Sequence, residues 1–243
     1  MENEVACTVS HDIPRNDLVL GICCVRYSTA GAPSAQFEER LARLLQLRKT
    51  APLSAGEEAV RLQCRDFLRN GIYKPTGRGK PSSEYLLRTA AEGNFPRINY
   101  PVDVNNFISL SAMAPVSLWD MQRAKAGEFV FRLGKEREEY VFNSAGQLLS
   151  LHDLVTGCAV SDTESCPIVT PVKDSMAAKI QESTQCIAAC IYYPVNDNYQ
   201  QQLTALLKEF VFLLTNTIDN TGSFGIVERS ETKTVTFANL EEL

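Results

Sequence analysis

Histidines and long apolar runs are both scarce in this sequence. Its 243 residues include two histidines, His11 and His152. A histidine-based metal site would need both, so we expect structural roles for them and predict no metal or other cofactor. The longest apolar runs, such as 18–25, are too short to span a bilayer. The first residues are acidic and lack the apolar core of a secretory signal. We therefore expect a soluble, cytoplasmic protein with no membrane partner.

Common signatures of hydrolases, nucleotide-binding proteins and zinc sites are also missing. The sequence has no GxSxG, GxxxxGK(S/T), GxGxxG or HExxH, so nucleophile elbows, P-loops, dinucleotide folds and zincins have no support. Eight cysteines are present, and no pair has CxxC spacing. Most lie in apolar runs, as Cys23 and Cys24 do, where a thiol behaves as a small hydrophobe. We predict reduced core cysteines, not a disulfide framework.

The first half of the sequence carries mostly helical patterns. The apolar run 18–27 predicts a buried strand. Ser54 and Glu57 have the spacing of a capping box, and Pro101 suits the first residue of a helix. The stretch 74–81 is rich in Gly and Pro and predicts a loop. Together with the apolar periodicity, these signals predict four helices, over 34–51, 54–70, 82–91 and 101–113.

After Gly127 the apolar spacing becomes that of strands. The order of elements predicts a mixed α+β fold of sheets flanked by helices, not a regular βαβ series. We expect a single domain over 1–243, in which 127–165 is a candidate small inserted β-rich subdomain. The predicted elements are two strands around a charged turn (128–133 and 139–143), strands near 158–160, 168–172 and 186–193, a helix over 199–217, and a closing hairpin of 223–227 and 232–237.

The net charge of -5 hides an uneven distribution. Between Arg61 and Arg97 there are eight Lys and Arg against three Asp and Glu, so this segment is +5 and the remainder −10. Such a segment can bind a polyanion despite the acidic total. Gly77 and Gly79 flank Arg78, which would let backbone N–H groups approach an anion. The alternative is a solvated helix face followed by an ordinary loop.

A dense cluster of Asn and Asp lies at 99–106 in an apolar context. If Pro101 begins a helix, Asp103 and Asn106 share a face, and Asn99 lies just ahead of them. These residue types are poor inside a helix unless their side chains bond something. Two interpretations remain open. Asp103 bonds the first-turn N–H groups, or the cluster lines a pocket for a polar ligand.

The segments around this cluster resemble the editing module of the bacterial phenylalanyl-tRNA synthetase beta subunit, its third and fourth domains. Residues 102–107, Val-Asp-Val-Asn-Asn-Phe, are similar to that module's Asp-Val-Thr-Asn-Tyr stretch. Residues 115–120, Pro-Val-Ser-Leu-Trp-Asp, are similar to its Pro-Leu-His-Ala-Phe-Asp stretch. The likeness covers most of 60–195. Proteins made of this module alone share the Pro-Ser-Ser-Glu pattern seen at 81–84 and the Pro-Val-x-Asp-Ser pattern seen at 171–175.

In that family, the pocket hydrolyses tyrosine wrongly attached to the phenylalanine tRNA, by attack of a positioned water on the ester. Ser117 stands where the family has His, so the family's candidate base is missing there, and under the editing hypothesis Ser117 positions this water. The residues implied to line the amino-acid pocket are Asn99, Asp103, Asn105 and Asn106. Further candidates for substrate contact, chosen for their polarity, are Glu84, Asp174 and Ser175. The candidates for contact with tRNA phosphates are Arg78, Lys80 and Lys173.

Two hypotheses from different classes follow. The first is a free-standing editing-type module that binds tRNA or an aminoacyl ester and acts as an aminoacyl-tRNA deacylase in trans. The second is a non-catalytic RNA- or amino-acid-binding module, because Ser117 replaces the family's His and the family's Glu falls near Ala188. We expect tRNA or aminoacyl-tRNA as the partner and no DNA. We do not expect aminoacylation, because the synthetase's catalytic and anticodon-binding regions have no counterpart in this sequence.

Overall fold

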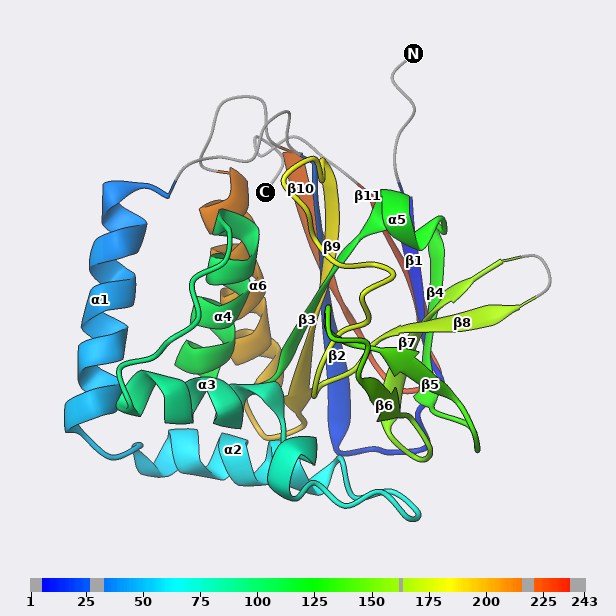
Figure 1. The fold of residues 1–243 in the computed structure, drawn as a ribbon, viewed down its shortest axis with the longest axis horizontal. Helices are drawn as coiled ribbons and strands as arrows, with labels where there is room; N and C mark the ends of the chain where they lie inside the picture. Colours follow the sequence, from blue (N-terminus) through cyan, green and yellow to red (C-terminus); the bar gives the residue numbers. More distant parts are fainter. Residues whose placement is uncertain (1–5, 27–32, 162–163, 216–220, 237–243) are drawn as a thin grey trace.

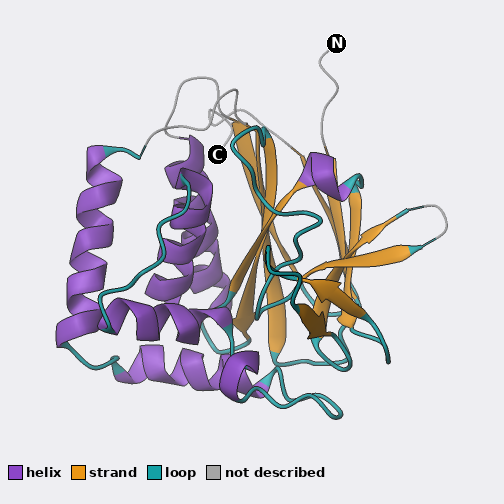
Figure 2. Cartoon of the chain, in the orientation of Figure 1, coloured by secondary structure: helices purple, strands orange, loops and turns teal. Residues whose placement is uncertain are grey.

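Two large β-sheets and a set of helices make up the fold (Figures 1 and 2). The computed structural model describes residues 6–26, 33–161, 164–215 and 221–236. A four-stranded sheet has the order β10 (Thr221–Val227), β2 (Leu18–Arg26), β9 (Cys186–Pro194), β3 (Val116–Asp120). A five-stranded sheet has the order β11 (Thr232–Thr236), β1 (Ala6–His11), β4 (Glu128–Leu133), β7 (Val155–Val160), β8 (Ser165–Val169). A separate ribbon pairs β5 (Glu139–Val141) with β6 (Leu148–Ser150).

The main helices lie on one side of the four-stranded sheet, and the five-stranded sheet lies on its other side (Figure 1). Because both faces of β2 and β9 are covered, these strands are apolar almost without interruption. This mixed fold, with helices flanking a sheet, confirms the predicted fold class. The helices are α1 (Ala35–Thr50), α2 (Ala55–Asp66), α3 (Ser82–Ala91), α4 (Tyr100–Ala112), the short α5 (Met121–Ala124) and α6 (Tyr199–Thr215), with a 3-10 turn, η1 (Gly77–Gly79).

Local capping signals determine where the helices begin. Ser34 accepts a hydrogen bond from the amide of Phe37 at the start of α1. Ser54 and Glu57 form the predicted capping box of α2. Asn99 caps α4 by accepting from the amide of Val102, and Pro101 lies in the first turn. The four predicted helices of the first half and the helix before the C-terminal strands are therefore confirmed.

Aromatic side chains fill the space between the two large sheets. Trp119 of β3 packs edge-on against Phe129 of β4, with ring centroids 5.2 Å apart. Phe131 of β4 meets Tyr192 of β9 at 5.9 Å. Each such side chain stabilises the fold by about 1.5–3 kcal/mol through burial alone. One continuous core therefore joins the sheets.

Two predicted strand pairings are wrong, although the strands themselves exist. β10 and β11 do not form a closing hairpin, because β10 pairs with β2 and β11 pairs with β1 in the other sheet. Likewise β4 pairs with β1 and β7, whereas β5 pairs with β6. Phe237, at the end of the predicted hairpin, and residues 216–217, at the end of the predicted last helix, lie outside the described residues.

All eight cysteines lie among the described residues and are free. Seven are buried and Cys166 is exposed, which confirms the predicted core role for most of them. Within the described ranges, no helix is long and apolar enough to cross a membrane.

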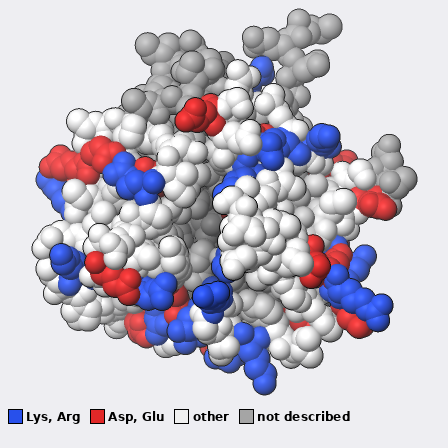
Figure 3. Space-filling view, in the orientation of Figure 1, with Lys and Arg blue, Asp and Glu red and all other residues white. Residues whose placement is uncertain are grey.

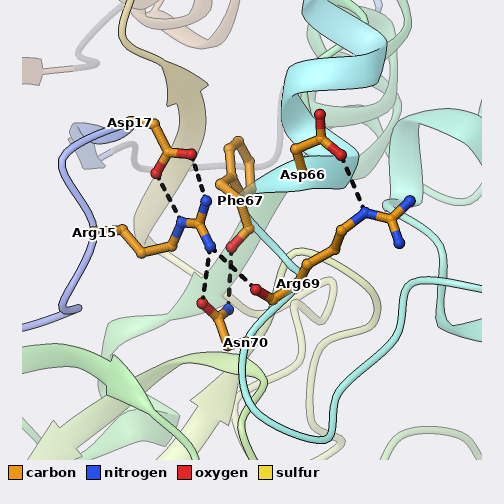
Figure 4. A network of polar contacts seen from close by, with 6 residues as sticks. All are labelled: Arg15, Asp17, Asp66, Phe67, Arg69 and Asn70. Atoms are coloured by element: carbon orange, nitrogen blue, oxygen red, sulfur yellow. Dashed lines mark hydrogen bonds and ion pairs between the residues drawn. The ribbon is translucent and has the colours of Figure 1, made fainter.

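A polar network attaches the end of α2 to the segment before β2 (Figure 4). The guanidinium of Arg15 donates to the carboxylate of Asp17, with Nε 2.7 Å from Oδ1. The same group donates to the carbonyl oxygen of Arg69 at 3.1 Å and to Oδ1 of Asn70 at 3.2 Å. Asn70 donates in turn to the carbonyl of Phe67 at 3.0 Å. The network fixes the point at which the chain leaves α2 for the loop that contains η1.

Candidate functional site

A cleft of about 1140 Å³ lies beside α3. One wall comes from η1 and α3, and the other from Phe142, Gln147 and the segment 172–179. The face shown in Figure 3 is hollowed between the helices and the sheets, with Lys and Arg atoms at the margin of the hollow. Segments far apart in the sequence therefore meet at one concave surface. Its lining residues include Arg78, Lys80, Ser82, Glu84, Tyr85, Arg88, Lys173 and Lys179.

The lining of this cleft is strongly positive. It holds five cationic side chains and one acidic side chain, Glu84. The Glu84 carboxylate is already neutralised, because Arg65 donates to both of its oxygens and Arg61 lies 3.3 Å from one of them. An anion that enters the cleft therefore meets an excess of positive charge. The five cations are Arg78, Lys80, Arg88, Lys173 and Lys179.

The basic segment 61–97 does not form one positive surface. Four of its eight cations make ion pairs: Arg61 and Arg65 as above, Arg69 with Asp66, and Arg97 with Glu38 and Asp103. Among the described residues, Arg78, Lys80 and Arg88 have no ion-pair partner, and all three line the cleft. The free positive charge of the segment is thus gathered largely at the cleft.

Two aromatic rings accompany the cations. The Lys173 ammonium lies 3.9 Å from the centroid of the Phe142 ring, and the Arg88 guanidinium lies 5.5 Å from that of Tyr85. The Tyr85 side chain is half exposed. Burial and the positive charge of Arg78 lower the pKa of Lys173. A negatively charged ligand would relieve this repulsion between cations.

The wall that carries Lys173 is held by a buried polar network. Asp174 accepts from the amide of Leu118 at 3.1 Å and from that of Thr170 at 3.4 Å. Tyr140 donates to the carbonyl of Lys173 at 2.6 Å. Burial of the carboxyl raises the pKa of Asp174 to about 7, although hydrogen bonds to it act in the opposite direction. These contacts hold the backbone at Lys173, whose side chain lines the cleft.

Ser117, the predicted water-positioning residue, lies behind this wall and not in the lining of the cleft. Its side chain has no exposed surface. Its hydroxyl donates to the carbonyl of Thr170 at 3.0 Å and lies 3.1 Å from the hydroxyl of Tyr192. Ser175, also predicted as a substrate contact, is buried, and its hydroxyl accepts from the amide of Ala177 at 3.1 Å.

The Asn and Asp cluster is also separate from the cleft, and three of its members have local structural contacts. Asn99 caps α4 as described above. Asp103 is buried and accepts from Nε of Arg97 at 2.7 Å and from the amide of Ile98 at 2.9 Å. Asn105 is buried and donates to the carbonyl of Val116 at 3.4 Å, while its Oδ1 has no partner among the described residues. Asn106 is partly exposed.

The cleft thus brings together four of the predicted residues: Arg78, Lys80, Lys173 and Glu84. Sequence reasoning did not identify four others: Tyr85, Arg88, Phe142 and Lys179. A signal existed for Tyr85 and Arg88, because a spacing of three places them on one face of α3. Phe142 and Lys179 come from distant segments, and no local pattern marks them. In the described part of the chain, no group of three or more His, Cys, Asp or Glu side chains has a metal-binding arrangement.

Comparisons with known proteins can be set beside this geometry. A family model described as the B3/4 domain matches residues 63–206, which include the cleft walls. The phenylalanine–tRNA ligase beta subunit of Syntrophotalea carbinolica (strain DSM 2380 / NBRC 103641 / GraBd1) is 27% identical over 113 residues. The match covers 43% of this chain and 14% of that protein, so the chain spans only a small part of its relative.

Proposed function

The chain belongs to the B3/4 domain family, and from this premise we propose that it binds the acceptor end of an aminoacyl-tRNA in the cleft beside α3 and hydrolyses misacylated tRNA in trans. One observation carries the proposal: five cations and two aromatic rings converge on one cleft. Proteins that bind single-stranded RNA combine a positive groove for the phosphates with aromatic rings on which bases stack. The volume of about 1140 Å³ suits a terminal nucleotide that carries an amino acid.

Ester hydrolysis in this cleft would depend on electrostatics more than on a general base. The reaction needs a positioned water and hydrogen-bond donors where the oxyanion develops. Arg78, Lys80 and Lys173 supply cationic donors in the lining. Both oxygens of the Glu84 carboxylate already bind Arg65, and Arg61 lies beside one of them, so this group is not free to hold the attacking water.

A second candidate function is binding without hydrolysis. The observation that favours it is the complete burial of Ser117, whose hydroxyl makes its hydrogen bonds inside the protein. In this case the chain would hold the acceptor end and leave the ester intact. The two functions share a binding site and differ only in turnover, so one assay separates them.

The deciding experiment is incubation with a panel of tRNAs, each carrying a correct or an incorrect amino acid, followed by the rate of ester loss. The editing function predicts faster hydrolysis for at least one mispaired tRNA than in buffer alone. Background rates for every pair, together with salt-dependent tRNA binding, would leave the binding function. Background rates without any tRNA binding would exclude both.

A charge-matched pair of variants tests whether the cleft is the site. Arg78→Gln/Lys80→Gln removes two cations of the lining, whereas Arg43→Gln/Lys208→Gln removes two exposed cations of α1 and α6 outside it. Each cation that contacts a single-stranded phosphate contributes about 0.7 to the slope of log affinity against log salt. The cleft variant should therefore lose about 1.4 from that slope for single-stranded RNA. The control variant should keep the original slope.

A further inference from the structure

We infer that the N-terminal end of α3 is a phosphate-binding subsite within the cleft, formed by Ser82 with Lys80, Arg78 and Lys173. Its ligand is a single phosphate group, of an RNA end or of a free nucleotide. The inference deepens the proposed function, and the experiment below is arranged so that either can fail alone. The subsite rests on two observations: an uncapped helix end surrounded by cations, and hydroxyl groups that have no partner.

The first turn of α3 begins without a side-chain cap. Pro81 is the N-cap residue and has no side chain that could accept a hydrogen bond. The amide of Ser82 donates to the carbonyl of Pro171 at 2.9 Å, and that of Glu84 to the carbonyl of Pro81 at 3.0 Å. Within the described residues, the amide of Ser83 has no hydrogen-bond partner. A free amide and the helix dipole favour an anion at such an end.

Two adjacent hydroxyl groups in this turn lack partners. The oxygens of Ser82 and Ser83 are both buried, and neither makes a hydrogen bond among the described residues. A buried polar group without a partner costs about 1–3 kcal/mol. Ser82 lines the cleft, whereas Ser83 does not. Because Ser82 lines the cleft, its hydroxyl is the one that a bound phosphate would satisfy.

The charges around this end favour an anion. Lys80 directly precedes the N-cap residue, and Arg78 lies in η1, whose Gly79 carbonyl accepts from the Tyr73 hydroxyl at 2.8 Å. Lys173 faces them from the opposite wall. Burial and, to a smaller extent, the positive charge of Arg78 lower the pKa of Lys173, so the two cations lie close enough to repel each other. A phosphate, with several acceptor oxygens, matches three cations and a hydroxyl better than a carboxylate does.

The test is calorimetric titration of the full chain with inorganic phosphate, adenosine 5′-monophosphate, adenosine and a short RNA ending in CCA. The subsite predicts binding of inorganic phosphate and the monophosphate, and much weaker binding of adenosine. Preference for the RNA over the monophosphate would identify an RNA phosphate as the source, and the reverse order a free nucleotide. No detectable binding of inorganic phosphate or the monophosphate would overturn the subsite.

Ser82→Ala and Ser83→Ala form a matched pair for the same titrations. Both variants remove an unpartnered buried hydroxyl from the same helical turn, so neither should destabilise the fold. Ser82→Ala should lower phosphate affinity about tenfold, because a hydrogen bond to a charged group is lost. Ser83→Ala should leave it within about twofold. Equal affinities for the two variants would contradict the inference.

A third variant keeps the test independent of that single hydrogen bond. Ser82→Asp places a carboxylate at the helix end, and it should raise the melting temperature and abolish phosphate binding. Retained phosphate binding in this variant would exclude the site. Phosphate binding without any affinity for tRNA would refute the proposed function alone. Deacylation of a misacylated tRNA without any binding of inorganic phosphate or the monophosphate would refute the subsite alone.

Discussion

Asp174 allows the wall of the cleft to be tested through its dependence on pH. Its carboxyl accepts from the amides of Leu118 and Thr170, and burial raises its pKa to about 7. The residue as a whole is partly exposed, but the carboxyl itself is enclosed. Lys179 is the cation that lowers this pKa, and its effect does not cancel the effect of burial. The perturbation we consider is Asp174→Asn, which removes the titration and keeps the shape.

Proton binding determines whether the free energy of unfolding rises or falls with pH. In the unfolded chain the carboxyl titrates near its ordinary value of 3.8, so between there and about pH 7 the folded protein holds more protons. The contribution of this carboxyl to the free energy of unfolding is therefore largest at low pH, and it falls as pH rises to about 7. A shift of about three units corresponds to at most about 4 kcal/mol. Because the residue is partly exposed, we expect about 2 kcal/mol between pH 5 and pH 7.5.

The groups packed against Asp174 should not obscure this effect. Burial raises the pKa values of Tyr140, Cys190 and Tyr192 well above their ordinary ranges, so all three stay neutral from pH 5 to pH 7.5. The hydrogen bonds from Arg132 lower the pKa of Glu138, so this carboxyl contributes at more acidic pH. The difference between the wild type and Asp174→Asn thus isolates one group.

The assay is urea unfolding of both proteins at pH 5, 6, 7 and 7.5. As pH rises over this interval, the free energy of unfolding of the variant should increase relative to that of the wild type by about 2 kcal/mol. Asp197→Asn is the control, because Asp197 is exposed and its removal should leave the profile parallel to that of the wild type. Parallel profiles for Asp174→Asn would refute the reasoning, since they would mean that the carboxyl is ionised at no cost inside the wall.

Two further predictions concern Asp103 and the glycines. Asp103→Ala should destabilise the protein by about 2–3 kcal/mol, because the buried carboxylate of Asp103 binds Arg97. The same variant should keep its phosphate affinity within about twofold of the wild type. A large loss of affinity without a loss of stability would instead make Asp103 a ligand contact. Gly134→Ala should cost about 2 kcal/mol or more in urea unfolding, because the new Cβ would lie 2.0 Å from the carbonyl oxygen of Leu151. Gly56→Ala in α2, where nothing lies within 4 Å, should instead stabilise by about 0.5 kcal/mol, and a loss for this variant would contradict the comparison.

The helices could be predicted because their signals are local. Ser54 and Glu57 form the capping box that their spacing indicates, and Pro101 lies in the first turn of its helix. Strand pairing depends on contacts between distant residues, which no local pattern reports. β1 and β11 come from opposite ends of the described chain and pair with each other, so the sequence order of β10 and β11 suggested a hairpin that does not form.

The candidate site shows the same difference between local signals, which the sequence reports, and long-range contacts, which it does not. Loop signals and charge singled out Arg78 and Lys80 in the sequence, and in the structure both line the cleft together with Lys173. The polar cluster was ambiguous because a buried Asp in a first helical turn looks the same in sequence whether it binds a ligand or the chain. In the structure Asp103 binds Arg97 and the backbone, and this contact could not be read from spacing alone.

The charge of the cleft depends on residues that do not line it, and this leads to a last prediction. Glu84 is the acidic residue of the lining, and Arg65, outside the lining, holds its carboxylate. Arg65→Gln should therefore free negative charge in the cleft and lower phosphate affinity about fivefold, since a partly buried pair of this kind is worth about 1 kcal/mol. Arg65→Gln/Glu84→Gln should restore the affinity, because the uncompensated carboxylate is gone. If the single variant folds and binds phosphate as the wild type does, the cleft owes its positive character to the number of its cations and not to which of its charges are paired.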